Sequence, residues 1–241
     1  MNIPKQSSTL IPWSAETGNG TACICIPWAG AGAAPFRAWA PVLGDAADVY
    51  GVRLAGRESR QTEPPATALG DVVDELVREL TELGAPRVAL FGHCSGALLA
   101  FELAHALRRS GSAPEVAHLF VASQLPPRLF QNARVDKDQD LARYVPEEFR
   151  REPELLEVLL PILTADMKLV SDYAPSADAP LDVPLTVVYG ACDVDLGGAE
   201  VDGWRHETTG PTAFREIAGA DHLFSGPAWL ELAETVRAAL T

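Results

Sequence analysis

The pentapeptide Gly92-His93-Cys94-Ser95-Gly96 constrains the fold of this 241-residue chain more than any other feature. It stands between a short apolar run, Arg87–Phe91, and a helix-forming run, Ala97–Ala104. A strand, a tight turn and a helix in this order form a nucleophile elbow, whose usual pattern is G-x-S-x-G. In that register Cys94 occupies the nucleophile position at a helix N-terminus, where the helix dipole favours an anion. The pattern therefore predicts covalent acyl transfer through a thiol.

The rest of the chain alternates short apolar runs with helical periodicity, which predicts a mostly parallel sheet covered by helices on both faces. We expect one α/β domain of the α/β-hydrolase kind over residues 1–241. The expected strands are Ala22–Pro27, Val49–Leu54, Arg87–Phe91, His118–Ala122, Leu185–Tyr189 and Phe214–Ile217, and the expected helices are Phe36–Leu43, Leu69–Leu83, Ser95–Ser110 and Pro227–Leu240.

One long stretch, residues 125–184, interrupts this alternation. It contains no convincing strand, but it contains helical pieces such as Pro153–Leu163 and Ala165–Tyr173. Ligands bind at the carboxyl ends of the strands in open α/β sheets, and inserted segments often gate such sites. We therefore expect a helical lid here, with a purely stabilising subdomain as the alternative.

Charge and cysteine content exclude several kinds of partner. The formal net charge of −14 disfavours binding to nucleic acid or to an anionic membrane surface. Residues 1–14 lack the apolar stretch of a signal peptide, and no run approaches the roughly 20 apolar residues of a membrane-spanning helix. The four cysteines are expected to be free thiols in the cytoplasm. Cys23 and Cys25 share a strand face but lack two further ligands at suitable spacing, so no metal is expected.

An activated thiol needs a base, and in this fold the chain order is nucleophile, acid, histidine. His222 follows the last expected strand and precedes the last helix, so it is the predicted base. Asp193, after the strand that ends at Tyr189, is the predicted acid, with Asp195 as the second choice. Of the other histidines, His93 is expected to point elsewhere, His105 and His118 to be structural, and His206 to lie in a polar loop.

Two backbone N–H groups should form the oxyanion hole. We assign one to Ser95, the residue after the nucleophile, and the other to Ala29, in the loop after the first core strand. Two other interpretations of the elbow stay open. Cys94 could be a buried small side chain in a non-catalytic binding module, or Ser95 could be the nucleophile if the elbow were shifted by one residue.

Several segments together resemble one known family. Pro27–Gly32 is similar to its Pro-His-Ala-Gly-Gly loop, with Trp28 in place of the histidine, and Ala55–Glu58 to its Pro-Gly-Arg-Glu turn. The elbow is similar to Gly-His-Ser-Met-Gly, with Cys94 and Ser95 replacing serine and methionine. Further correspondences are Leu160–Asp166, Tyr173, Trp204 and Asp221–Phe224. The family is that of the type II thioesterases that accompany polyketide and nonribosomal peptide synthetases.

This resemblance implies an α/β-hydrolase fold and an acyl group carried on the phosphopantetheine arm of an acyl or peptidyl carrier protein, with no cofactor of the enzyme's own. We expect a monomeric thioesterase that works through Cys94, His222 and Asp193. The alternative is an acyl or aminoacyl transferase, because a cysteine nucleophile exchanges one thioester for another. Arg53, Arg57 and Arg60 are candidate contacts for the carrier protein, or else solvated surface residues.

Overall fold

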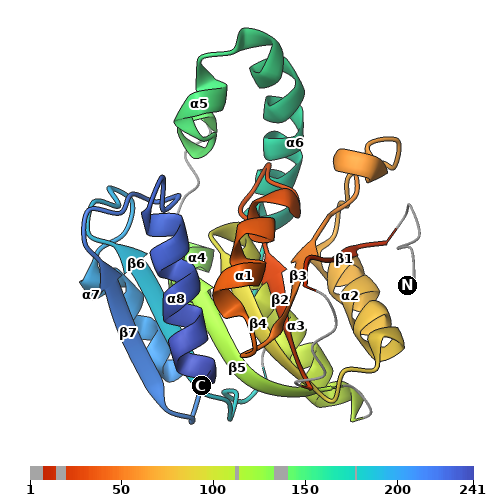
Figure 1. The fold of residues 1–241 in the computed structure, drawn as a ribbon, viewed down its shortest axis with the longest axis vertical. Helices are drawn as coiled ribbons and strands as arrows, with labels where there is room; N and C mark the ends of the chain where they lie inside the picture. Colours follow the sequence, from red (N-terminus) through yellow and green to blue (C-terminus); the bar gives the residue numbers. More distant parts are fainter. Residues whose placement is uncertain (1–7, 15–19, 112–113, 133–140, 177) are drawn as a thin grey trace.

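A seven-stranded sheet forms the centre of the molecule in the computed structural model, which describes residues 8–14, 20–111, 114–132, 141–176 and 178–241 (Figure 1). The strand order is β1-β3-β2-β4-β5-β6-β7. Strand β1 runs antiparallel to β3, and every other neighbouring pair is parallel. The strands are β1 (Leu10–Pro12), β2 (Thr21–Ile26), β3 (Asp48–Val52), β4 (Arg87–His93), β5 (Glu115–Ala122), β6 (Leu185–Gly190) and β7 (Thr212–Ile217).

Both faces of the sheet are buried, because successive strand residues enter two different cores. On β2, Ile24 and Ile26 pack with helices α2 (Leu69–Leu83) and α3 (Ser95–Ser110), whereas Cys23 and Cys25 belong to the opposite core. That second core is closed by the helical segment η1 (Ala34–Trp39), by α1 (Ala40–Leu43) and by α8 (Ala228–Leu240). The predicted mostly parallel sheet with helices on both faces is therefore confirmed.

The segment between β5 and β6 is helical, as the sequence predicts. It contains α4 (Pro127–Asn132), η3 (Leu141–Tyr144), α5 (Glu147–Arg150) and α6 (Pro153–Ser171). Figure 1 shows α5 and α6 standing beyond one end of the sheet. A Cβ placed on Gly30 would lie 3.1 Å from Cβ of Leu163, so α6 packs closely on the loop that follows β2. Residues 133–140 and 177 of the expected lid lie outside the described residues.

Apart from shifts of one to three residues at the ends of strands and of α8, the elements differ from expectation in three places. Two helical pieces were expected around Leu163, but α6 is continuous and contains Pro161 in its interior. A proline removes one hydrogen bond without ending a helix that packing supports. The expected helix Phe36–Leu43 divides into η1 and α1. Strand β1 was not predicted, because three residues are too few to show a period.

The remaining short helices are η2 (Glu58–Arg60), α7 (Gly198–Val201) and η4 (Asp202–His206). Among the described residues, no helix combines the length and the apolar character that crossing a bilayer requires.

Candidate active site

Cys94 lies between the last residue of β4 and the first residue of α3, at the turn that the sequence predicts. Its backbone has φ 52° and ψ −123°, a conformation that residues with side chains rarely adopt. The N–H of Cys94 donates to the carbonyl of Ala122 at the end of β5, at 2.8 Å. The turn therefore holds the thiol at the N-terminus of a 16-residue helix, where the helix dipole stabilises negative charge.

The two glycines of the elbow are required by close backbone contacts. A Cβ on Gly92 would lie 2.2 Å from the carbonyl oxygen of Gly96. A Cβ on Gly96 would lie 2.4 Å from the carbonyl oxygen of Pro27 and 2.5 Å from that of Ile26. The first turn of α3 therefore sits directly against the end of β2, next to the loop that contains Ala29.

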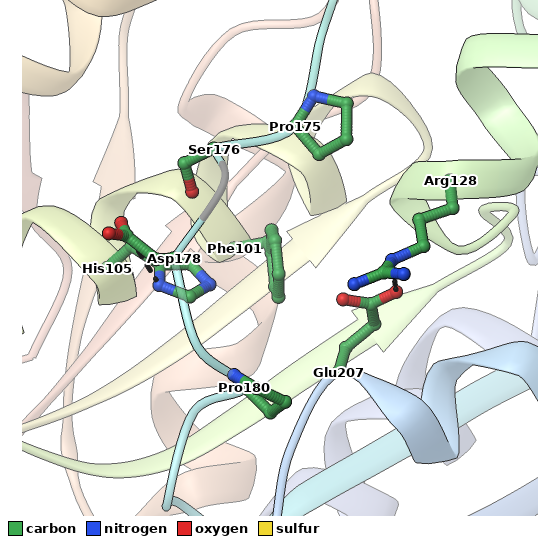
Figure 2. Close-up of a pocket in the computed structure, with 8 residues that line it drawn as sticks. All are labelled: Phe101, His105, Arg128, Pro175, Ser176, Asp178, Pro180 and Glu207. Carbon is green, nitrogen blue, oxygen red and sulfur yellow. Dashed lines mark ion pairs between the residues drawn. The ribbon is translucent and has the colours of Figure 1, made fainter.

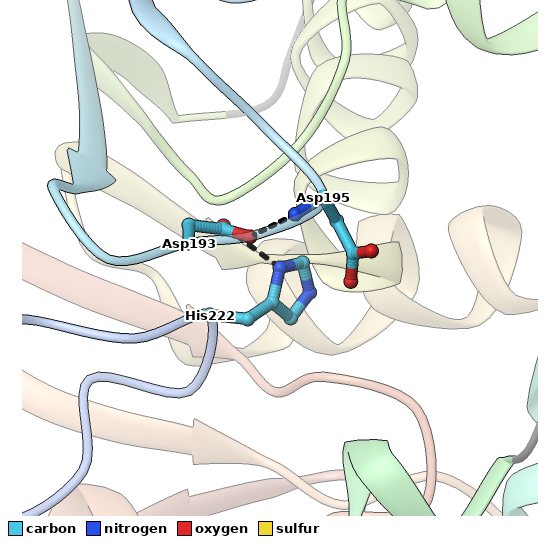
Figure 3. Close-up of side chains that lie close together, drawn as sticks. All are labelled: Asp193, Asp195 and His222. Carbon is cyan, nitrogen blue, oxygen red and sulfur yellow. Dashed lines mark hydrogen bonds and ion pairs between the residues drawn. The ribbon is translucent and has the colours of Figure 1, made fainter.

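His222 and Asp193 form a hydrogen-bonded pair. Nδ1 of His222 is 2.8 Å from Oδ2 of Asp193, whose side chain has no exposed surface (Figure 3). The two loops that supply these residues are tied together, because the N–H of Cys192 donates to the carbonyl of Ala220 at 2.8 Å. The other ring nitrogen, Nε2, is buried and has no partner in hydrogen-bond geometry among the described residues, while Cys94 is close enough to act on the imidazole. Nε2 is therefore available to a reacting group.

Asp195, the second candidate for the acid, takes a different place. Its backbone N–H donates to Oδ1 of Asp193 at 2.9 Å, while its carboxylate lies on the other side of the imidazole in Figure 3. Ligand atoms of Asp193, Asp195 and His222 lie within 4.8 Å of one another, close enough to surround a metal ion. Because both oxygens of Asp193 already accept hydrogen bonds, we assign the cluster to orientation of the imidazole rather than to metal binding.

The charge state of His222 follows from its neighbours. Burial by itself lowers the pKa of His222, but the negative charge of Cys94 and the hydrogen bond to Asp193 outweigh it and raise the pKa to about 10. The imidazole is therefore protonated at neutral pH.

His93, the second residue of the elbow, contacts the backbone of His222, the predicted base, directly. Its Nε2 lies 2.8 Å from the backbone carbonyl of His222. Burial and the nearby charge of His222 lower the pKa of His93 to about 3, so the ring stays neutral and Nε2 is the donor. The sequence predicts that His93 points elsewhere and gives no sign of this contact between β4 and the loop of His222.

Ala29 and Ser95, the two predicted oxyanion-hole residues, lie on neighbouring segments. The loop after β2 makes a turn in which the N–H of Ala31 donates to the carbonyl of Trp28 at 3.1 Å. Gly30, third in this turn, has φ 84°, as a type II turn requires. Ser95 is the first residue of α3, so its N–H has no partner within the helix. Both residues are buried beside the elbow.

Comparison with known proteins identifies the family of this site. Residues 22–240 match the model of the thioesterase domain. The chain belongs to the thioesterase family. Gramicidin S biosynthesis protein GrsT of Aneurinibacillus migulanus is 30% identical over 210 residues, which cover 83% of this chain and 81% of GrsT.

Solved structures of thioesterases share the fold. The thioesterase RedJ from the prodiginine pathway of Streptomyces coelicolor is 32% identical, with a TM-score of 0.81, over 93% of this chain and 92% of RedJ. The type II thioesterase YbtT of the yersiniabactin pathway is 26% identical, with a TM-score of 0.78, over 97% and 96% of the two chains. This thioesterase therefore has the predicted α/β-hydrolase fold and is of the type II kind found in nonribosomal peptide and polyketide biosynthesis.

The three arginines that were considered for carrier docking are buried in this thioesterase, so neither surface role is correct. Arg57 pairs with Asp166 at 2.6 Å, and Arg60 pairs with Glu75 at 2.9 Å. Arg53 donates to the carbonyl of Ser8 at 2.7 Å. Their spacing near a strand end is typical of a basic surface patch, whereas Asp166, the acidic partner of Arg57, lies far along the sequence.

The other histidines have structural surroundings, as expected for His105 and His118. His118 lies 2.8 Å from Oγ1 of Thr186. His105 is buried beside a hollow of about 280 Å³ in the thioesterase, where its Nδ1 lies 3.6 Å from Asp178 (Figure 2). Arg128 and Glu207 lie on the other side of this hollow, which contains none of the residues of the Cys94 site.

Proposed function

We propose that this protein hydrolyses acyl groups from the phosphopantetheine arms of acyl or peptidyl carrier proteins in polyketide or nonribosomal peptide biosynthesis, through an acyl-Cys94 intermediate. The observation that carries the proposal is the position of Cys94 at a strained strand-to-helix turn, close enough to His222 for its charge to raise the pKa of the imidazole against the effect of burial. Membership of the thioesterase family supports the reaction class. By their names, GrsT serves gramicidin S biosynthesis and RedJ serves the prodiginine pathway, while YbtT is a type II thioesterase of a nonribosomal peptide and polyketide pathway.

The first half-reaction transfers the acyl group to the enzyme. The Cys94 thiolate attacks the carbonyl carbon of the carrier-bound thioester, a new C–S bond forms, and negative charge develops on the carbonyl oxygen. The N–H groups of Ala29 and Ser95 are assigned to this oxyanion. When the tetrahedral intermediate collapses, the original C–S bond breaks and the leaving sulfur takes a proton from Nε2 of His222.

The second half-reaction releases the acid. Neutral His222 accepts a proton from water, and the oxygen of that water attacks the acyl-Cys94 carbonyl. Collapse breaks the bond between the carbonyl carbon and Sγ of Cys94, so the free acid leaves and the thiolate–imidazolium pair is restored. Asp193 holds Nδ1 of His222 through both steps, which keeps Nε2 directed at the reacting atoms.

We further propose that residues 125–184 act as a helical lid within one α/β-hydrolase domain spanning residues 1–241. Tyr144 of η3 lies edge-on to His222, with ring centroids 5.4 Å apart. Val145 and Leu163 form a buried apolar cluster with Ala29. The inserted segment therefore contacts both the proposed base and the proposed oxyanion loop, where it would restrict the access of bulk solvent to the acyl-enzyme.

A second candidate function, transfer of the acyl group to another carrier thiol or to an amine, is favoured by the cysteine itself. Exchange of one thioester for another is nearly isoenergetic, so an acyl-cysteine can pass its acyl group to a second thiol. An acyl-serine is an oxoester, and its formation from a thioester is downhill. We place hydrolysis first because the rest of the chain resembles thioesterases.

Product analysis separates these functions. The enzyme is incubated with an acyl-loaded carrier protein and a second, unloaded carrier, and all three proteins and the small molecules are analysed by mass spectrometry. Hydrolysis predicts free acid as the main product. A loaded second carrier or an amide would instead establish transfer, and intact substrate would favour a binding module. We propose that the protein acts as a monomer in the cytoplasm, without a metal or cofactor of its own.

A further inference from the structure

A buried ion pair joins the helix α6 to the turn that follows β3. The guanidinium of Arg57 binds both carboxylate oxygens of Asp166, with Nη2 at 2.6 Å from Oδ1 and Nη1 at 2.6 Å from Oδ2. The side chains are 4% and 8% exposed, so both charges are removed from water. Bidentate pairs of this kind fix the relative orientation of the two groups as well as their distance.

Both members of this pair also bind the loop that contains Ala29. Oδ2 of Asp166 accepts the backbone N–H of Gly30 at 2.8 Å. Nη1 of Arg57 donates to the carbonyl of Ala31 at 2.8 Å. Gly30 and Ala31, the two residues that follow Ala29, are therefore held by the same ion pair. Asp166 accepts from Gly30, and Arg57 donates to Ala31.

A neighbouring residue holds the far end of the same loop. Oε1 of Glu58 accepts the N–H of Ala34 at 3.2 Å, and the same oxygen would lie 2.2 Å from a Cβ on Gly32. The loop from Pro27 to Ala34 thus has few alternative conformations, because its polar groups are bound from the turn at Arg57 and from α6.

We infer that Arg57 and Asp166 are positioning residues for the oxyanion hole, because they bind Gly30 and Ala31, the residues that follow Ala29 in the turn. The N–H of Ala31 in turn donates to the carbonyl of Trp28, which belongs to the peptide that carries the N–H of Ala29. This inference rests on the proposed function, in which that N–H stabilises the tetrahedral oxyanion. An oxyanion donor must be aligned before the charge develops, and the loss of one such donor slows comparable enzymes about 10²- to 10³-fold. The ion pair also makes the position of α6 and the geometry of the loop interdependent.

Two reactions at the same sulfur test the inference. Alkylation of Cys94 by iodoacetamide displaces iodide at a tetrahedral carbon and creates no oxyanion. Acylation of Cys94 by butyryl-N-acetylcysteamine passes through a tetrahedral oxyanion. The ratio of the acylation rate to the alkylation rate therefore reports the oxyanion hole, while changes in the thiolate or in its access affect both rates together.

Two variants remove the contacts in different ways. Asp166→Asn disturbs the acceptor of the Gly30 N–H but leaves the charge of Arg57 unpaired. The double variant Arg57→Met/Asp166→Leu removes both charges with similar side-chain volumes, which buried ion pairs often tolerate without unfolding. Glu75→Gln is the matched control, because it removes the charge of one of the two acidic partners, Glu63 and Glu75, of another buried arginine, Arg60, that does not bind the Ala29 loop.

We expect the rate ratio to fall about 10- to 100-fold in both variants, less than for complete loss of a donor, and to stay at the wild-type value in Glu75→Gln. In both variants, the kcat for acylation should fall by a larger factor than the KM rises. An unchanged ratio, or equal losses in both rates, would show that the pair serves only the fold and would overturn the inference. If the wild-type enzyme is not acylated at Cys94 at all, the proposed function fails together with the inference.

Discussion

His93 donates a hydrogen bond from Nε2 to the backbone carbonyl of His222 at 2.8 Å, so the elbow directly supports the loop that carries the proposed base. The ring of His93 is also enclosed by aromatic neighbours, with Trp28 at 5.2 Å and Phe224 at 5.5 Å between ring centroids. Cys94 thus carries the thiol of the elbow. His93, the residue before it, holds the loop of His222, whose pKa depends on the charge of Cys94.

Replacement of His93 by phenylalanine tests this support. The variant keeps a ring of similar size but leaves the carbonyl of His222 without its donor, which should lower the free energy of unfolding by about 1–3 kcal/mol. Acylation should slow as well, because the imidazole of His222 loses its fixed position. The control is His118→Phe, which removes a hydrogen bond to Thr186 on the sheet. If both variants lose stability but acylate at the wild-type rate, His93 does not position His222 for the reaction.

Asp193 and Asp195 form a matched pair for identifying the acid. Asp193→Asn replaces the carboxylate bound to Nδ1 of His222 and should reduce the acylation rate by about 10- to 100-fold, less than the 10⁴-fold typical of serine enzymes. Asp195→Asn keeps the backbone N–H that binds Asp193, so its rate should stay within about threefold of wild type, well below the effect of losing a triad acid. Stopped-flow measurement of thiol release from butyryl-N-acetylcysteamine compares the two. A larger loss in Asp195→Asn would reverse the assignment.

The protonation of His222 gives a prediction for pH dependence. Its pKa in the folded protein is about 10, above the ordinary value of 6.5, chiefly through the charge of Cys94 after the opposing effect of burial. Protonation of His222 therefore contributes stability that is complete below about pH 6.5 and is lost as the pH rises through about 10. NMR titration of the imidazole should give a midpoint near 10 in the wild type.

The matched variant for this titration is Cys94→Ala, which removes the charge that raises the pKa of His222. Its imidazole should titrate at a clearly lower pH, because burial then opposes protonation with less compensation. A midpoint that does not change between the two proteins would show that Cys94 and His222 are not coupled.

The outcome of the reaction should depend on the identity of the nucleophile atom. In Cys94→Ser the intermediate is an oxoester, a poorer acyl donor to thiols, while water remains available as the acceptor. If the cysteine serves reversible transfer, the variant should give a higher ratio of free acid to acylated second carrier than the wild type does. Equal ratios, with acid as the main product of both proteins, would eliminate transfer and leave hydrolysis.

The parts of the site that sequence alone could predict are those set by local chain geometry. The elbow depends on five consecutive residues whose glycines are needed for contacts within and next to the turn. His222 and Asp193 follow strand ends, and the carboxyl ends of parallel strands meet at one edge of the sheet. Helices α2 and α3 have the predicted boundaries because their apolar periodicity is long and regular.

The parts that could not be predicted depend on contacts between distant segments. Arg57 and Asp166 are 109 residues apart, and nothing in either short segment indicates that they meet. Three closely spaced arginines near a strand end, Arg53, Arg57 and Arg60, have the composition of a surface patch. Only the fold shows that each of them is buried. The contact of His93 with the carbonyl of His222 leaves no sequence signal, because any residue at position 222 has that carbonyl.

The most direct test of the account is the location of the acyl group on the enzyme. The protein is mixed with an acyl-loaded carrier protein, quenched in acid within milliseconds to seconds, and digested for peptide mass spectrometry. We predict an acyl adduct on Cys94 that neutral hydroxylamine removes, absent in Cys94→Ala and retained in Ser95→Ala, because Ser95 contributes only its backbone N–H. An adduct on Ser95, or turnover without any adduct on Cys94, would contradict the central claim that Cys94 is the nucleophile.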